Sequence, residues 1–397
     1  MNNKKHFYYS NEQKRERDHK MRITTKLTLC DDPTIASFEQ AILNTLTPDT
    51  KSLLILASES DSWCSEEVDA LLTNLKIPIL GGVFPFIIFE GNQLSNGTLI
   101  IGLNVSTNVF VVENLSHGKC NIESQLEILS PQIASERHLM TIVDGLTSNI
   151  QRFTEGLYEI TGYHSVSFGG GAGTLDFVQK PCLFTNQGML FDAAIIAAIP
   201  TPFRLEVSHG WEIAAGPFLV TRSEGNVLEK LDYKPALDVY QTHVVKNTEQ
   251  PFDLSSFYDI AKGYPLGIEN LEGDILVRAP LSEDKKSLIC LGEIPENSIV
   301  YLLKGVRKNL IAASGESAKL AYKANKSTHE NDTSVVVFDC ISRPLFLGDD
   351  FCKELSIIKE NVNNHSHIFG ALSIGEIGSS NNGPIDWLNK STAIAVF

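Results

Sequence analysis

Three stretches of this chain run an apolar strand directly into glycine, and they constrain its fold more than any other feature. Residues 165–173 read SVSFGGGAG, where Val166 and Phe168 alternate with serines as in a half-buried strand. Residues 77–84 (IPILGGVF) and 367–376 (HIFGALSIGE) repeat the design. Glycine has no Cβ, so it permits positive φ and close approach of other groups. Taken together, the junctions predict sheets that end around a shared space free of side chains. Any one of them alone favours a tight turn with no ligand.

Composition narrows the classes of function. The 397 residues suffice for two domains, and 43% apolar with 20% charged residues is typical of a soluble globular protein. A net charge of −15 argues against nucleic acid or an anionic membrane as partner. The chain shows no apolar run long enough to span a bilayer and no signal peptide in its first residues. Seven cysteines without a C-x-x-C motif predict free thiols in a reducing cytoplasm.

Helical and strand patterns are mixed along the chain without strict βαβ alternation. Thr34 is a suitable N-cap for an amphipathic helix that begins at Ile35, for example. Short connections between successive strands in residues 84–115 favour antiparallel hairpins. We therefore expect an α+β fold of two domains with mixed, largely antiparallel sheets covered by helices. The expected division is a disordered lead over residues 1–20, a first domain over 21–248 and a second over 249–397.

The chain resembles the FIST family, whose members combine a FIST N and a FIST C region. The resemblance covers the chain from about Lys26 to the C-terminus. Its most specific motifs are Cys340-x-x-Arg343 and Gly375-Glu376, each at a strand end. The other residues that carry it are Gly81-Gly82, Gly169-Gly170-Gly171, Ser208-His209-Gly210, Val220-Thr221, Leu231-Asp232, Leu347-Gly348 and Phe369-Gly370-Ala371.

The resemblance implies a sensor of small ligands that acts in signal transduction. Some members, the nitric oxide sensing proteins (NosP), bind haem and regulate a histidine kinase. The resemblance therefore makes haem b, with a diatomic gas as signal, one expected ligand. The alternative is a FIST-type sensor of a small metabolite such as an amino acid, without haem.

A haem needs an apolar pocket and an axial ligand, often histidine. His209 is the first candidate, because the strand period places it on one face with Trp211. The alternative is an ordinary core histidine bonded to a carbonyl group. His164, which leads into Gly169 and Gly170, is the second candidate, and His243 on a predicted helix is the third.

The Cys340-x-x-Arg343 motif places a thiol near a guanidinium group. With Glu376, it predicts a grip on an amino acid, in which Arg343 binds the carboxylate and Glu376 the ammonium group. The alternative is a structural Arg343–Glu376 salt bridge, with Cys340 as a small core residue.

Enzymatic motifs are missing from the sequence, which contains no G-x-S-x-G, no P-loop and no H-E-x-x-H. A cysteine nucleophile at Cys340 stays an open alternative, as does a pure interaction scaffold. We therefore expect a non-enzymatic cytoplasmic sensor. It would pass its signal by contact to a partner such as a histidine kinase.

Overall fold

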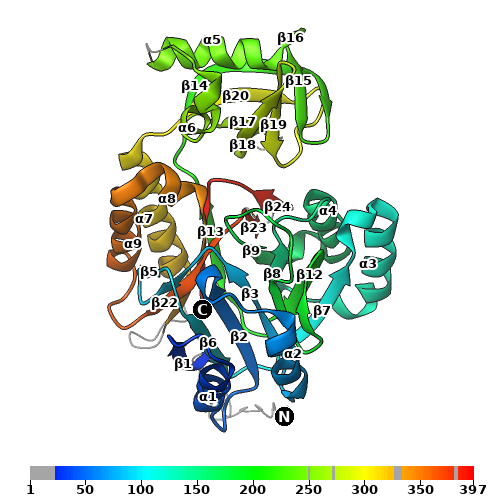
Figure 1. The fold of residues 1–397 in the computed structure, drawn as a ribbon, viewed down its shortest axis with the longest axis vertical. Helices are drawn as coiled ribbons and strands as arrows, with labels where there is room; N and C mark the ends of the chain where they lie inside the picture. The colour runs from blue at the N-terminus through cyan, green and yellow to red at the C-terminus, as the bar shows by residue number, and fades with distance from the viewer. Residues whose placement is uncertain (1–22, 249–250, 271–272, 326–332, 380–382) are drawn as a thin grey trace, which may run out of the picture.

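A body and a smaller lobe make up the computed structural model, which describes residues 23–248, 251–270, 273–325, 333–379 and 383–397 (Figure 1). The body contains two chain segments, which run up to residue 211 and onward from residue 305. The lobe is formed by the residues between them. The mixture of helices with largely antiparallel sheets confirms the predicted α+β class.

Three six-stranded sheets form the body. The first has the order β1 (Thr24–Cys30), β6 (Thr98–Leu103), β2 (Ser52–Ser58), β3 (Ile79–Phe84), β10 (Leu183–Thr185), β11 (Gly188–Leu190). The second has the order β7 (Asn108–Glu113), β12 (Ala193–Ala198), β8 (His138–Asp144), β9 (Val166–Ala172), β23 (Glu376–Ser379), β24 (Ile385–Leu388). The third has the order β13 (Arg204–Ser208), β25 (Thr392–Val396), β21 (Ser334–Cys340), β22 (His367–Ser373), β4 (Phe86–Phe89), β5 (Asn92–Leu94).

Helices cover the outer faces of these sheets (Figure 1). The body helices are α1 (Ile35–Thr45), α2 (Ser65–Asn74), α3 (Lys119–Ile133), α4 (Ile150–Thr161), α7 (Arg307–Ala324), α8 (Ser342–Leu347) and α9 (Phe351–Glu360). As predicted, the Thr34 side chain caps α1 by accepting the backbone N–H of Ser37.

The three sheets repeat one plan, and the repeat explains the three glycine junctions. The third and fourth strands of each sheet are parallel, and all other neighbours are antiparallel. We call a repeat the chain segment that supplies the third and fourth strands of one sheet. The fifth and sixth strands of each sheet form a hairpin that comes from another repeat. Hairpin β4–β5 follows β3 in the chain but joins β22, β10–β11 follows β9 but joins β3, and β23–β24 follows β22 but joins β9. The exchange is cyclic, so each repeat completes the sheet of another.

One glycine recurs at the same register in each repeat. Gly81, Gly169 and Gly370 lie opposite the fourth residue of β2, β8 and β21. A Cβ at any of the three would overlap the carbonyl oxygen of the residue opposite. Strands β3, β9 and β22 also contact one another in the core of the body. The space expected at these junctions is therefore filled by closely packed backbone, and the three glycines lie within strands rather than in the tight turns of the alternative.

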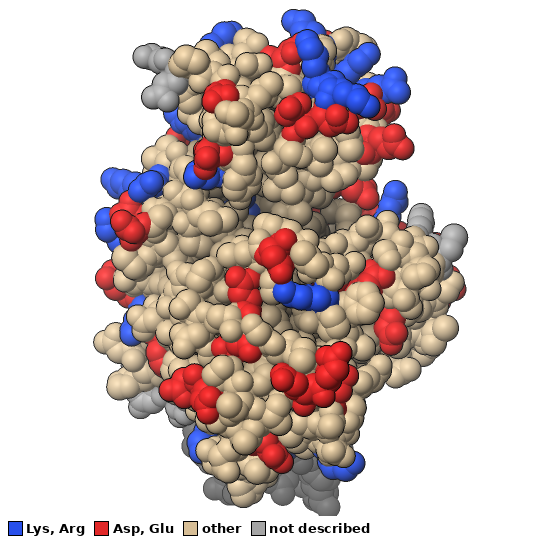
Figure 2. Space-filling view, in the orientation of Figure 1, with Lys and Arg blue, Asp and Glu red and all other residues tan. Residues whose placement is uncertain are grey.

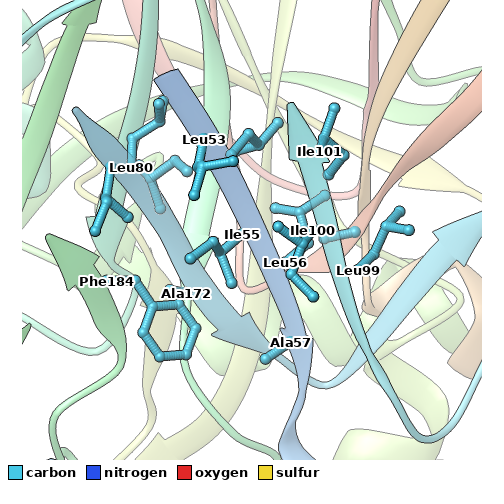
Figure 3. Close-up of a cluster of buried hydrophobic side chains, with 14 of the residues drawn as sticks. Leu53, Ile55, Leu56, Ala57, Leu80, Leu99, Ile100, Ile101, Ala172 and Phe184 are labelled. Carbon is cyan, nitrogen blue, oxygen red and sulfur yellow. The ribbon is translucent and has the colours of Figure 1, made fainter. Parts of the chain in front are cut away.

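The largest apolar cluster of the body is centred on these strands, and two smaller clusters lie beneath the covering helices. Figure 3 shows Leu53 and Ile55 of β2 between Leu80 of β3 and Ile100 of β6. All of these side chains are fully buried. The continuous apolar sequence of β2 is what a strand covered on both faces requires.

The lobe is one seven-stranded sheet that closes because β14 also pairs with β15. Its order is β14 (Glu212–Glu224), β20 (Ile299–Lys304), β17 (Leu266–Glu269), β18 (Ile275–Asp284), β19 (Ser287–Leu291), β15 (Val227–Leu231), β16 (Lys234–Pro235). Helices α5 (Ala236–Thr248) and α6 (Phe257–Ala261) pack on it around a separate core.

The sheets do not follow the division that we expected between residues 248 and 249. Glu212 pairs with Lys304, so the lobe joins chain from both sides of that position. Strand β4 pairs with β22, and β9 pairs with β23, in the same way. The physical units are instead a body of two chain segments and an inserted lobe. The expected disordered lead, residues 1–20, lies outside the described residues.

Candidate functional site

Arg343 is the centre of a buried polar cluster beneath the lobe. Its side chain is 0% exposed at the start of α8. Nε donates to Glu354 Oε1 at 2.8 Å and lies 3.3 Å from Asp339 Oδ1. The other four N–H groups have acceptors at 2.7–3.2 Å, namely the carbonyls of His209, Lys390 and Leu310 and the hydroxyl of Ser314.

This hydrogen bonding corrects the role expected for Arg343. A guanidinium has five N–H donors, and protein acceptors occupy all five. Arg343 therefore has no donor left for a ligand carboxylate. Its carboxylate partners are Asp339 and Glu354 rather than Glu376. The salt bridge is structural, as the alternative proposed, but with other partners.

Glu376 and Cys340 lie next to this cluster, and both are buried. The Glu376 carboxyl accepts hydrogen bonds from Ser391 Oγ at 2.7 Å and Ser373 Oγ at 2.9 Å. Burial raises the pKa of Glu376 to about 8. Burial also raises the pKa of Cys340 to about 12, so its sulfur is a neutral thiol at physiological pH. This protonation state does not favour Cys340 as a nucleophile.

Lys390 completes the cluster, and sequence reasoning missed it. It follows β24 in a left-handed conformation, with φ of 56°, and is 1% exposed. Its Nζ donates to the carbonyl of Lys262 in the lobe at 3.1 Å and lies 5.1 Å from the Trp211 ring centroid. Burial lowers the pKa of Lys390 to about 8. No sequence motif marks this lysine, because its partners come from three distant segments.

A cavity of about 460 Å³ opens between the lobe and the body, next to Cys340 and Lys390. Figure 2 shows the surface hollowed where the two parts meet. The body walls are the loops that follow β8 and β21, at the carboxyl ends of parallel strands, where ligands commonly bind in α/β sheets. The lobe wall comes mainly from β18, β19 and the residues after them.

The lining changes in character from the floor to the mouth. Cys340, Asn389 and Lys390 supply buried polar groups at the body side. Four apolar side chains of the lining are 37–58% exposed, namely Phe177, Tyr258, Leu281 and Leu345. The cavity thus pairs a polar floor with an apolar rim.

Two domains of one known family match this chain. The FIST N domain matches residues 52–234, and the FIST C domain matches residues 236–379. The chain belongs to the FIST family. No curated protein matches it. FIST domains are ligand-binding sensory domains of signal transduction, so this FIST protein is a sensory protein.

The two FIST domains meet inside the lobe, between β16 and α5. Both domains therefore contribute strands to the lobe, and both line the cavity. Among the described residues of this FIST protein, none of the helices has the length and hydropathy needed to cross a bilayer. The same residues contain no cluster of histidine, cysteine and acidic side chains suited to a metal ion.

The haem expected for the NosP subtype does not fit His209. An iron-bound imidazole ligates through one nitrogen and carries a proton on the other. His209 Nδ1 accepts the backbone N–H of Trp211 at 2.9 Å, so the ring proton is on Nε2. Neither nitrogen then has a free lone pair for iron. Burial lowers the pKa of His209 to about 4, which keeps this tautomer neutral.

The other haem candidates do not gather around His209. His164 is exposed, and its ring lies tilted against that of Tyr163 with the centroids 3.8 Å apart. His243 lies on α5 of the lobe beside Phe218, and its pKa is lowered by partial burial. Trp211 packs on Phe346 instead of an open pocket.

The glycines expected to lie against a porphyrin pack against other protein residues instead. Gly169 and Gly170 are buried in β9, against Thr141 and Ser373. His209 and Gly210 border a cavity of about 380 Å³, but the other haem candidates, His164 and His243, and Trp211, Gly169 and Gly170 do not line it.

Proposed function

We propose that this FIST protein senses a small organic molecule, such as a metabolite, in the cavity between lobe and body. The supporting observation is Asn389, which is 1% exposed and borders the cavity. Its Oδ1 finds no hydrogen-bond partner among the described residues. A buried amide oxygen without a partner costs about 1–3 kcal/mol, which a ligand donor would recover.

The size and position of the cavity support the same function. Its volume of about 460 Å³ falls within the ~300–1,000 Å³ usual for small-molecule sites. Because the lobe is an insertion joined to the body by two chain crossings, a ligand that touches both parts favours one lobe position over others. A signalling partner, for which a histidine kinase is our proposal, would read that position.

This proposal revises the expected amino-acid grip. Arg343 is fully bonded and Glu376 faces serines, so neither is the direct contact that we expected from the sequence. Cys340 borders the cavity and is the one member of that trio that a ligand would touch. Sensing without haem is the form of the function that the geometry around His209 favours.

The test is ligand screening on the full chain with a variant that blocks the cavity. Leu281→Trp places a larger side chain at the mouth, and Leu320→Trp is its control, because Leu320 is also exposed but lies on α7 outside the lining. A metabolite panel that includes amino acids would be screened by thermal shift and then by calorimetry. We expect at least one ligand whose binding is lost in Leu281→Trp and kept in Leu320→Trp.

Two results would contradict the proposal. One is a ligand bound equally by both variants. The other is a histidine-ligated absorption spectrum after hemin addition that disappears in His209→Ala. The second result would support the haem and nitric oxide alternative instead.

A further inference from the structure

Three cations lie at or next to the cavity, and each already contacts protein partners. Arg343 is bonded through all five N–H groups. Arg278, in β18, donates to the carbonyls of Glu293, Val277 and Trp387 and to the side chain of Gln151. Lys390 Nζ is held between the Lys262 carbonyl and the Trp211 ring. Of these three side chains only Lys390 borders the cavity, and its ammonium group already contacts a carbonyl and a ring.

The hydrogen-bond acceptors and negative charges of the lining favour a ligand with N–H donors or positive charge. Asn389 uses its Nδ2 on the Leu388 carbonyl at 2.8 Å and leaves Oδ1 unbonded. The lining also contains Glu293, a half-buried carboxylate. A protein with a net charge of −15 adds a long-range preference for neutral or positive ligands.

The N-terminus of α4 also borders the cavity, and its dipole alone would favour an anion. Two buried carboxylates bond the loop that leads into that helix. Asp144 Oδ1 accepts the backbone N–H of Leu146 at 3.0 Å, and Asp192 accepts the hydroxyl of Thr147. This loop therefore already bonds two acidic side chains beside the cavity, which disfavours a further anion there.

The side chains of the rim favour an apolar group on the ligand. Phe177 is 58% exposed, borders the cavity and holds a left-handed backbone conformation with φ of 52°. A bulky residue in that conformation is an outlier that usually requires a reason. Leu281 and Leu345 lie on the same rim. Exposed apolar side chains gathered around one opening are typical of a binding site.

We propose that the ligand is an amphipathic amine or amide, not a free carboxylate. Its polar end donates an N–H to Asn389 Oδ1. Its apolar end, of the size of a phenyl or isobutyl group, lies among Phe177, Leu281 and Leu345. This inference rests on the proposed function, because it assigns the chemical class of the ligand for the same cavity.

The experiment uses three probes that share a phenyl group and differ in the polar end: 2-phenylethylamine, 3-phenylpropanamide and 3-phenylpropanoate. Calorimetric titration of the full chain would give each dissociation constant at neutral pH. We expect the amine or the amide to bind at least about ten-fold more tightly than the carboxylate, the effect of one well-placed hydrogen bond.

Two variants connect this selectivity to the named residues. Asn389→Asp adds a carboxylate, so it should favour the amine further over the amide. Phe177→Asn removes the ring but suits the left-handed conformation, so it should weaken all phenyl probes without lowering the unfolding temperature. Phe191→Asn is the control, since Phe191 is also exposed but lies outside the lining.

The outcomes separate the two proposals. Tightest binding of 3-phenylpropanoate, with loss in Leu281→Trp, would overturn the inference and leave the proposed function standing. If the phenyl probes fail but the metabolite panel yields a ligand of this cavity, an anionic ligand refutes the inference and an N–H donor supports it. Failure of every probe and of the whole panel would overturn the proposed function itself.

Discussion

Replacing Arg343 by methionine tests the interpretation of the buried cluster as structural. The substitution keeps the volume but removes five hydrogen bonds from a side chain that is 0% exposed. It leaves Asp339 and Glu354, both 0% exposed, without their cation. Breaking a buried pair on one side costs about 3–5 kcal/mol. We therefore expect the free energy of unfolding at pH 8 to fall by that amount.

The loss should depend on pH, because the Asp339 carboxyl can take up a proton. Burial, with the nearby Glu354 carboxylate, already raises the pKa of Asp339 well above its usual value, while Arg343 lowers it. Without Arg343, the folded state retains the proton to higher pH. The unfolded chain releases that proton above a pH of about 4, so the folded state of the variant binds more protons and its stability falls as pH rises. The deficit should be smaller at pH 5 than at pH 8.

Urea unfolding followed by tryptophan fluorescence at pH 5, 6.5 and 8 would measure both effects. The control is Arg307→Met, since Arg307 bonds Asp350 at 3.1 Å but its side chain is 56% exposed. An exposed pair of this kind contributes about 0–1 kcal/mol. The reasoning is refuted if Arg343→Met is as stable as the control, or if its deficit is the same at every pH.

Three further substitutions test other parts of the structure. Gly370→Ala would drive a Cβ into the Val337 carbonyl and should cost about 3 kcal/mol or more in urea unfolding, whereas Gly263→Ala, with its nearest neighbour at 3.3 Å, should cost clearly less. Wild-type stability should fall as pH rises from 4.5 to 8, because burial raises the pKa of Glu376 to about 8 from 4.5. The unfolding temperature of Glu376→Gln should change less with pH over the same range. Burial lowers the pKa of Lys390 to about 8 from 10.5, so the unfolded chain binds more protons than the folded chain in that range. The stability of the wild type relative to Lys390→Met should therefore rise between pH 8 and 10. A constant difference would contradict the assignment.

Local features of the fold could be predicted from the sequence because they depend on neighbouring residues. The cap at Thr34 and the glycine junctions are examples. The cyclic exchange of hairpins could not, because Ile88 pairs with Gly370 across most of the chain and no local pattern encodes that choice. The lobe was missed for the same reason: its first and last strands, which pair at Glu212 and Lys304, are far apart in sequence.

The candidate site shows a similar limit. Residue types at strand ends indicated that Cys340, Arg343 and Glu376 belong together, and they do lie in one buried region. Their partners decide their roles, however, and the sequence did not identify Glu354 or Lys390. His209 illustrates the point, because a single backbone hydrogen bond from Trp211 takes the lone pair that an iron ligand needs.

The segment after β24 connects the cavity to the position of the lobe. Arg278 of the lobe donates an Nη1 hydrogen bond to the Trp387 carbonyl at 3.1 Å. Lys390 Nζ in turn donates to the carbonyl of Lys262 in the lobe at 3.1 Å. Asn389 lies between these two contacts and borders the cavity. A ligand bonded to Asn389 would therefore act on a segment that holds the lobe from both sides. Since interfaces of this kind rearrange between discrete states, a small shift of this segment would become a change in lobe position that a partner protein can read.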